Sequence, residues 1–214
     1  MSVISLQIDD QWVAVPAGTT LLAACAMVGV RLPQLCHYEQ LTPVAACRLC
    51  LVEVQGSERP LPACHTAAAG AMVVRTTTDA LVQQRRLLIE LLLAEGNHCC
   101  PVCVADGACE LQDLAEALGV HQLRVSEQLP RRGVDASHPR FLLDHNRCIL
   151  CTRCVRACDE LEGAHVWDVA YRGSHCRIVA GFDQPWGAVE ACTGCGLCVE
   201  VCPTAALVVK ETGP

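Results

Sequence analysis

Apolar and polar residues alternate along two short stretches near the start of the chain. Residues 3 to 8 and 12 to 15 alternate with a period of two, and Asp9-Asp10 separates them, which is typical of a β-hairpin. The runs Leu49 to Val54 and Met72 to Thr76 are also rich in β-forming residues. The pattern therefore predicts several strands in this part of the chain.

A helical pattern lies between these strands, in the segment PAGTTLLAACAMVGV. Thr19 or Thr20 can cap this helix, and Gly29 can end it. A helix among several strands predicts a small mixed sheet, and hence an α+β fold class.

Two further helices are predicted after this sheet. Residues 79 to 95, DALVQQRRLLIELLLAE, place leucines at helical spacing. Asp79 is the expected N-cap, and Gly96 stands just past the predicted end. A second helix, Cys109 to Leu118, also stops before a glycine, and the loop NHCCPVCVADGAC joins the two.

The rest of the chain divides into a connector and a repeated unit. Residues 120 to 140 are polar and contain Pro130, Gly133 and Pro139, so we expect a connector there. Beyond it the pattern CILCTRCVRAC returns as CTGCGLCVEVC, which indicates internal duplication. VWDVAYRG and CRIVAG predict a hairpin inserted between the copies. The predicted segments are 1–78, 79–119, 120–140 and 141–214.

Composition and the N-terminal sequence bear on the compartment. The chain has 214 residues, 18 of them cysteines, and only 3 % are aromatic. MSVISLQIDD lacks the basic and apolar regions of a signal peptide, and no apolar run reaches the ~18 residues that span a bilayer. We therefore expect a cytoplasmic, reduced, metal-loaded protein with no membrane span.

The charge balance argues against nucleic acid as a partner. The formal net charge is −7 at pH 7, whereas nucleic-acid binding favours clustered Lys and Arg. The basic runs Gln83 to Arg86 and Arg131-Arg132 are expected to be solvated faces.

The duplicated runs carry the strongest chemical signal. Each has the spacing C-x2-C-x2-C-x3-C, in which the fourth cysteine of bacterial ferredoxins binds the other cluster. Three close cysteines wrap one cubane, and the fourth, expected at the start of a helix, points toward the second cubane. We assign one [4Fe-4S] cluster to Cys148, Cys151, Cys154 and Cys202, and another to Cys158, Cys192, Cys195 and Cys198. A pair of zinc sites is the alternative.

Another cysteine group lies in the predicted mixed sheet. It consists of Cys36, Cys47, Cys50 and Cys64. The spacing resembles the plant-type arrangement, although the first gap is longer than four residues. A [2Fe-2S] cluster fits these ligands, and zinc is again the alternative.

The loop between the two helices offers three cysteines and a histidine. Cys100, Cys103 and Cys109 supply three thiolates for a [4Fe-4S] cluster, and His98 can fill the fourth corner. A neutral imidazole in place of a thiolate should raise the reduction potential, as it does in Rieske centres. Cys99 is the rival fourth ligand.

The remaining residues suggest no catalytic group. Cys25 lies on the apolar helix and is expected to be a small core residue, and Cys176 lies in the insert without an expected role. No G-x-G-x-x-G follows a strand, and neither a phosphate loop nor a nucleophile with a paired base is present. The chain is therefore expected to pass single electrons between partners that bind the substrates.

Three motifs carry a resemblance to a known family over nearly the whole chain. They are AEGNHCCPVCVADGACELQDLA, DHNRCILCTRCVRACDELEGAHVWDVAYRG and QPWGAVEACTGCGLCVEVCPT. They resemble the small diaphorase iron-sulfur subunit, the U subunit, of bidirectional NAD-reducing nickel-iron hydrogenases. His98 stands two residues before Cys100, as in that subunit, whereas Cys99 departs from its usual apolar residue. The chain is more distantly similar to the N-terminal part of the complex I large iron-sulfur subunit and to the cluster-bearing region of iron-only hydrogenases.

The resemblance implies a fold and a set of partners. The fold would be an N-terminal [2Fe-2S] ferredoxin-like β-grasp domain, a helical His/Cys cluster segment and a C-terminal bacterial-type two-cluster ferredoxin domain. The partners would be a diaphorase subunit that binds FMN and NAD, and the small and large nickel-iron subunits of a soluble hydrogenase. The N-terminal clusters would lie nearer the flavin subunit, and the ferredoxin clusters nearer the hydrogenase side.

Two other functions remain open at this point. The first is a relay subunit of a complex I-like or formate dehydrogenase system. The second is a zinc-stapled interaction module without redox chemistry.

Overall fold

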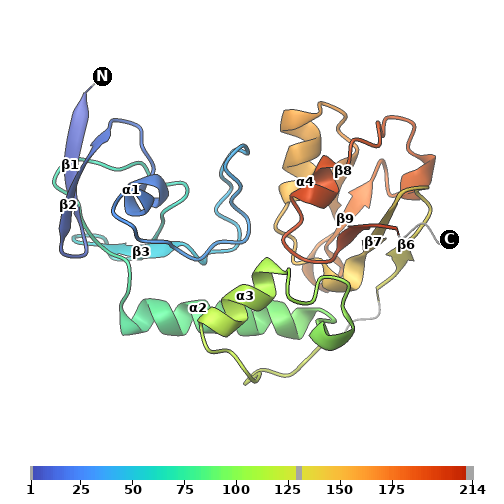
Figure 1. Ribbon diagram of the computed structural model, residues 1–214, viewed down its shortest axis with the longest axis horizontal. Coiled ribbons are helices and arrows are strands. Elements are labelled where there is room, and N and C mark those ends of the chain that lie inside the picture. Colours follow the sequence, from blue (N-terminus) through green and yellow to red (C-terminus); the bar gives the residue numbers. More distant parts are fainter. Residues whose placement is uncertain (1, 129–131, 211–214) are drawn as a thin grey trace. The chain divides into compact units, whose positions relative to one another are not determined.

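The computed structural model describes residues 2–128 and 132–210. The chain divides into two compact units (Figure 1). The first unit comprises Met1–His37 and Pro43–Leu88, and the second comprises Tyr38–Thr42 and Ile89–Pro214. Pro130, expected in the connector, and Arg131, expected on a solvated face, lie outside the described residues.

The predicted N-terminal hairpin is confirmed. β1 (Val3–Ile8) pairs antiparallel with β2 (Gln11–Pro16), and Ile8 faces Gln11 across the turn. Asp9 adopts a positive φ of 51° in that turn, a conformation that Asp tolerates better than most residues.

The hairpin belongs to a five-stranded sheet with the order β2-β1-β5-β3-β4. The other strands are β3 (Leu51–Val54), β4 (Leu61–Pro62) and β5 (Val73–Arg75). β5 runs parallel to β1 and antiparallel to β3. β3 and β5 lie within the two predicted β-rich runs, whereas β4 was not predicted.

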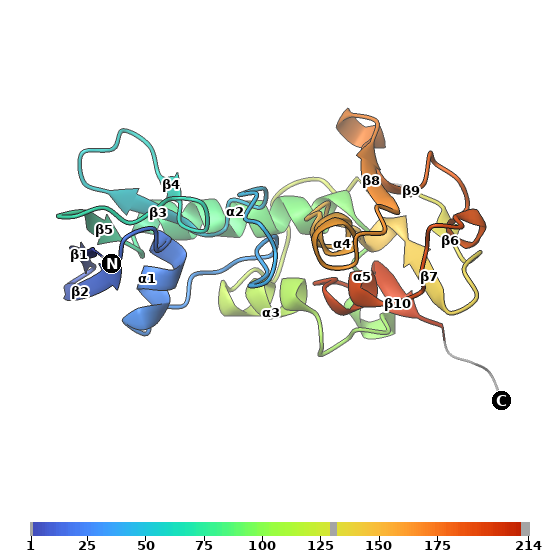
Figure 2. The ribbon, with the colours of Figure 1, turned by 90° about the horizontal axis from the view of Figure 1, so that it is seen from above.

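Helix α1 (Leu21–Met27) packs against this sheet (Figure 2). The Thr20 hydroxyl accepts a hydrogen bond of 3.2 Å from the Ala23 amide and so caps the helix, as predicted. Cys25 is fully buried in the same core, which confirms its expected place.

Helix α2 (Asp79–Glu95) ends before Gly96, as the sequence predicted, but its cap differs. The Thr78 hydroxyl accepts a hydrogen bond of 3.3 Å from the Leu81 amide. Asp79 as the N-cap was therefore wrong by one residue, because Asp79 already lies within the helix.

The second unit contains short elements around its cysteine loops (Figure 1). α3 (Glu110–Ala117) confirms the predicted helix. The strands β6 (Val134–Asp135), β7 (Phe141–Asp144) and β10 (Leu207–Val209) form a sheet in the order β10-β7-β6. The predicted connector thus contributes a short strand, β6. β8 (Trp167–Ala170) and β9 (Arg177–Ala180) form the predicted hairpin of the insert.

The internal duplication is visible in the backbone of the two cysteine runs. α4 (Arg153–Arg156) and α5 (Leu197–Glu200) occupy the same place in each run. The third cysteine of each run lies in this short helix. Cys158 lies at the start of the helical turn Ala157–Leu161 that continues α4, whereas Cys202 follows the end of α5. The expectation that the fourth cysteine starts a helix was therefore wrong for Cys202.

Short single turns complete the described secondary structure. They are η1 (Cys100–Val102), η2 (His145–Arg147), η3 (Ala157–Leu161), η4 (Gly173–His175) and η5 (Trp186–Ala188). In the part of the chain that the structure describes, no helix is both long and apolar enough to cross a bilayer.

Candidate functional site: four groups of cysteines

The first group lies on loops of the first unit and contains Cys36, Cys47, Cys50 and Cys64. The Cys47 amide donates to Cys36 Sγ at 3.5 Å. A hydrogen bond from the Cys36 thiol lowers the pKa of Cys47, and one from the Cys64 thiol lowers the pKa of Cys50. The other three thiols all act electrostatically on Cys64. The structure therefore brings together the four residues that the spacing predicted as one ligand set.

A buried arginine supports this loop. Arg85 is 5 % exposed and donates to the carbonyl oxygens of Leu49 at 3.1 Å, Leu51 at 2.8 Å and Thr76 at 2.9 Å. The expectation that residues 83–86 form a solvated face was wrong for Arg85, because these carbonyls replace water around its guanidinium. Its charge also acts on the nearby Cys50 thiol.

The second group lies between α2 and α3 and contains Cys100, Cys103 and Cys109. Cys103 and Cys100 both act electrostatically on Cys109. Burial raises the pKa of Cys100 and of Cys109. The guanidinium of Arg147 donates a close hydrogen bond to Cys103 Sγ, which places a positive charge directly on this group.

His98 lines the same pocket as Cys100 of the second group, and its imidazole is partly buried. Its Nε2 atom has no hydrogen-bond partner among the described residues. The ring packs on Gly96, where an added Cβ would come within 2.4 Å of Nε2. Burial lowers the pKa of His98, and the charge of Arg147 lowers it further, so the neutral ring is favoured. Cys99, the rival ligand, is exposed.

The third group lines a small cavity in the second unit. We call it the first cavity, and its cysteines are Cys148, Cys151, Cys154 and Cys202. Burial raises the pKa of Cys148 to about 11 and that of Cys151 to about 12. A positive charge inside the cavity is needed to keep such sulfurs deprotonated at neutral pH.

The fourth group lines another small cavity, which we call the second cavity. Its cysteines are Cys158, Cys192, Cys195 and Cys198. Each cavity therefore receives three cysteines from one run and the fourth cysteine of the other run. This exchange is the one that the ferredoxin spacing predicted.

The four groups of cysteines differ from a site for a single metal ion. In residues 2–128 and 132–210, no three His, Cys, Asp or Glu side chains converge as the ligands of a single metal ion do.

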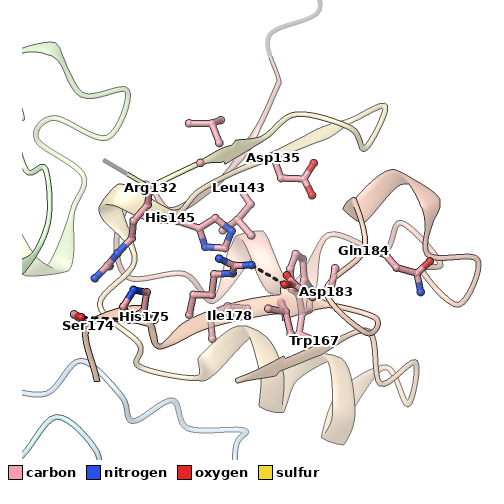
Figure 3. Close-up of a pocket in the computed structure, with 15 residues that line it drawn as sticks. Arg132, Asp135, Leu143, His145, Trp167, Ser174, His175, Ile178, Asp183 and Gln184 are labelled. Carbon is pink, nitrogen blue, oxygen red and sulfur yellow. Dashed lines mark hydrogen bonds and ion pairs between the residues drawn. The ribbon is translucent and has the colours of Figure 1, made fainter. Parts of the chain in front are cut away.

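An open pocket lies between β7 and the insert hairpin, and the ion pair of Arg177 with Asp183, 2.6 Å, forms part of its wall (Figure 3). None of the candidate cluster ligands lines that pocket.

Three family profiles match the chain in sequence order. A 2Fe-2S iron-sulfur cluster binding domain matches residues 2–79. The NADH-ubiquinone oxidoreductase-G iron-sulfur binding region matches residues 85–124, and the ferredoxin-like domain of NADH-quinone oxidoreductase subunit 3 matches residues 139–208. Together with the mixed helix and sheet content, these matches define an α+β iron-sulfur electron-transfer protein with an N-terminal [2Fe-2S] ferredoxin-like domain and [4Fe-4S] regions after it.

Two curated relatives are larger than this chain. One is the NADH-quinone oxidoreductase subunit designated G 2 of Rhizobium meliloti (strain 1021), which is 41 % identical over 209 residues that cover 96 % of this chain and 24 % of the relative. The other is the NADP-reducing hydrogenase subunit HndD of Solidesulfovibrio fructosivorans, which is 36 % identical over 222 residues, with 99 % and 37 % covered. The chain therefore spans well under half the length of these relatives.

A solved structure matches nearly the full length of both chains. It is a chain of the NAD⁺-reducing [NiFe]-hydrogenase in the H2-reduced state, with a TM-score of 0.91 and 35 % identity, covering 98 % of this chain and 88 % of the other. The chain belongs to the family of the iron-sulfur diaphorase subunit of NAD-reducing nickel-iron hydrogenases.

Proposed function

We propose that the chain relays single electrons in an NAD-reducing hydrogenase, between the nickel-iron subunits and a diaphorase subunit that binds FMN and NAD. Hydride chemistry at flavin and nicotinamide moves two electrons, while each iron-sulfur cluster moves one. A chain of clusters lets the two active sites work at a distance. The relay itself has no catalytic residue.

One observation carries the proposal: the exchange of the fourth cysteines between the two cavities. This arrangement fits two [4Fe-4S] clusters bound as in bacterial two-cluster ferredoxins. We assign Cys148, Cys151, Cys154 and Cys202 to one cluster, and Cys158, Cys192, Cys195 and Cys198 to the other.

The other two groups complete a set of four clusters. A [2Fe-2S] cluster fits Cys36, Cys47, Cys50 and Cys64. A third [4Fe-4S] cluster fits Cys100, Cys103, Cys109 and His98, with the unpartnered Nε2 atom as the nitrogen donor. We prefer His98 to Cys99 because the thiol of Cys99 is exposed.

The proposal also covers the domain layout and the setting of the protein. Residues 1–78 would form a β-grasp ferredoxin domain, which the sheet order β2-β1-β5-β3-β4 supports. Residues 79–119 would form the His/Cys cluster segment, 120–140 a connector, and 141–214 the two-cluster ferredoxin domain. The many free cysteines support a reducing compartment, which we take to be the cytoplasm.

A relay in a complex I-like system is the second candidate. The 41 % identity to an NADH-quinone oxidoreductase subunit supports it. The two candidates differ in their partners, since only a hydrogenase contains a nickel protein. Affinity purification of the tagged chain from its native cells, followed by nickel analysis of the complex, separates them.

An iron, acid-labile sulfide and zinc count on the anaerobically purified chain tests the cluster assignment. Four clusters predict about 14 iron atoms per chain. About 10 would remove one cubane from the proposal, and the His98 cluster would be the first suspect. Little iron with stoichiometric zinc would replace the relay by a zinc-stapled module.

A further inference from the structure

The insert between the cysteine runs, residues 159–191, supplies N–H donors to the sulfurs of the second cavity. The indole Nε1 of Trp186 donates to Cys192 Sγ at 3.3 Å. The Val166 amide donates to Cys158 Sγ, also at 3.3 Å. The insert therefore does more than add a hairpin, since it touches the candidate ligands directly.

Neighbouring groups hold Trp186 in this orientation. Its side chain is 1 % exposed. Its amide donates to Asp135 Oδ2 at 2.7 Å, and the Gly187 amide donates to Ser137 Oγ at 2.8 Å. A Cβ added at Gly187 would lie 2.4 Å from the Ser137 carbonyl oxygen. The turn that carries Trp186 is therefore pressed against residues 135–137.

Aromatic rings hold the indole itself. The ring of Trp186 stacks on Phe141 at 5.4 Å and lies 4.7 Å from the ring of His138. Trp167 meets it edge-on at 4.7 Å. A large ring packed among three others has little freedom to rotate, so the N–H stays directed at Cys192.

Trp167 places a second indole at the same cavity. It is 4 % exposed and hydrogen-bonds to Cys198. Burial raises the pKa of Cys198 to about 12, and the hydrogen bond from Trp167 opposes that rise. Both indoles thus favour negative charge on the sulfurs of this cavity.

The first cavity is built differently. The backbone amide of Leu150 donates a hydrogen bond to Cys148, and that of Arg153 donates one to Cys151. The Thr204 hydroxyl lies 3.8 Å from Cys202 Sγ. The protein has three tryptophans; the third, Trp12, lies on β2 of the first unit. Both tryptophans of the second unit therefore line the second cavity.

Hydrogen bonds to cluster sulfurs raise the reduction potential, because they stabilise the more negative, reduced cluster. We propose that Trp186, with Trp167 behind it, is a positioning residue that raises the reduction potential of the cluster in the second cavity. The insert thereby biases an electron in the ferredoxin domain toward that cluster. This inference rests on the proposed ligation by Cys158, Cys192, Cys195 and Cys198.

The test uses the full chain and a redox titration followed by electron paramagnetic resonance. Trp186→Phe keeps an aromatic ring and removes the N–H, and Trp167→Phe does the same for the second indole. The signal that is lost in Cys195→Ala identifies the cluster of the second cavity. Trp12→Phe is the matched control, since Trp12 is 67 % exposed and lies in the first unit.

At a fixed ambient potential, Trp186→Phe should lower the reduced-to-oxidised ratio of that cluster by up to about tenfold, which corresponds to about 59 mV for one electron. The other clusters should titrate as in the parent, and Trp12→Phe should change none. An unchanged ratio in Trp186→Phe, or an equal change in all clusters, would overturn the inference.

Isotope labelling supplies a test that leaves the structure intact. With ¹⁵N in the indole of tryptophan, pulsed spectra of the reduced second-cavity cluster should show a ¹⁵N coupling in the parent. The coupling should weaken in Trp167→Phe, which retains the Trp186 donor. If the parent holds a cluster in the second cavity but shows no ¹⁵N coupling, the inference is wrong and the proposed ligation stands. If the parent holds no cluster in this cavity, the proposed ligation is wrong as well.

Discussion

At the scale of single residues, the imidazole of His98 bears most directly on which residues bind the proposed third [4Fe-4S] cluster. A buried ring nitrogen without a partner costs free energy unless something binds it. Within the described residues nothing contacts Nε2 as a hydrogen-bond donor or acceptor. A metal bound at that atom would remove this cost, and the hydrogen bond between the ring and the backbone of Leu92 would orient the imidazole.

If the proposed four clusters are bound, replacing His98 with Ala should alter the spectrum of the His98 cluster and lower the iron content from about 14 to about 10 atoms per chain. His98→Cys should restore the iron and lower the reduction potential, because a thiolate adds a negative charge. Iron analysis and a redox titration check both. Cys99→Ser is the matched control. If Cys99→Ser loses the cluster and His98→Ala keeps it, then Cys99 is the fourth ligand.

Arg147 contacts the same group of cysteines. Its guanidinium donates to Cys103 Sγ and pairs with Asp144 at 3.1 Å. Arg147→Gln removes a positive charge next to a candidate ligand, so the reduced fraction of this cluster should fall several-fold at a fixed potential. Arg172→Gln, at an exposed position of the insert, should leave the titration unchanged. Equal shifts in the two variants would contradict a local effect.

Arg85 shows what a buried charge contributes to the first unit. Arg85→Ala would leave three carbonyl oxygens without their donor, and each buried unsatisfied group costs about 1–3 kcal/mol. We expect the free energy of unfolding of the first unit to fall by several kcal/mol, with loss of its cluster absorbance. Denaturant unfolding under anaerobic conditions measures this. Gln84→Ala, exposed on the same helix, should change little.

At the scale of elements, local periodicity was enough to predict the N-terminal hairpin, α2, α3 and the insert hairpin. It could not predict the burial of Arg85, because the three carbonyls that bind it lie 9 to 36 residues away in the sequence. The strand β6 was missed for a similar reason. Two residues have no measurable period, and only pairing with β7 makes them a strand.

The two cysteine runs differ at the residue before their short helices. Thr152 has φ of 59°, and Gly196 has φ of 90° at the equivalent position. A left-handed conformation costs a non-glycine residue about 1–2 kcal/mol. Gly196→Thr should therefore lower the thermal midpoint, and a Cβ there would also approach the Phe141 ring at 3.4 Å.

The reciprocal change provides the comparison. Thr152→Gly should leave the midpoint unchanged or raise it slightly, because relief of strain offsets the added flexibility of the unfolded chain. Anaerobic thermal unfolding followed by cluster absorbance measures both variants. A Gly196→Thr variant as stable as the parent would show that this backbone position carries no strain.

At the scale of the whole molecule, the sequence was more informative about ligands than about their surroundings. Spacing alone predicted which cysteines the structure brings together, because loop reach limits which thiols can share a cluster. The indole donors were not predicted, since their direction depends on the register of β8 with β9 and on the segment that holds Trp186. The sequence did contain one sign of their importance. Aromatic residues make up only 3 % of the chain, yet two of its three tryptophans lie in the insert.

The two units should depend on metal to different degrees. The first unit has a sheet core with Leu6, Ile8, Val15, Val52 and Val74 fully buried. The core of the second unit includes Cys154, Cys158 and Cys198 from the two cavities, and its helices α4 and α5 have four residues each. Helices this short are not stable by themselves.

Removal of iron by an anaerobic chelator should therefore unfold the second unit first. Amide hydrogen exchange should rise in α4, α5 and β10, while β1 and β5 keep part of their protection, because their hydrophobic contacts do not involve a cluster. Mass spectrometry of peptides from both units measures the difference, with the untreated chain as the reference. A chain that kept full protection everywhere after losing its iron would contradict this dependence, since the cavity cysteines would then pack stably without metal.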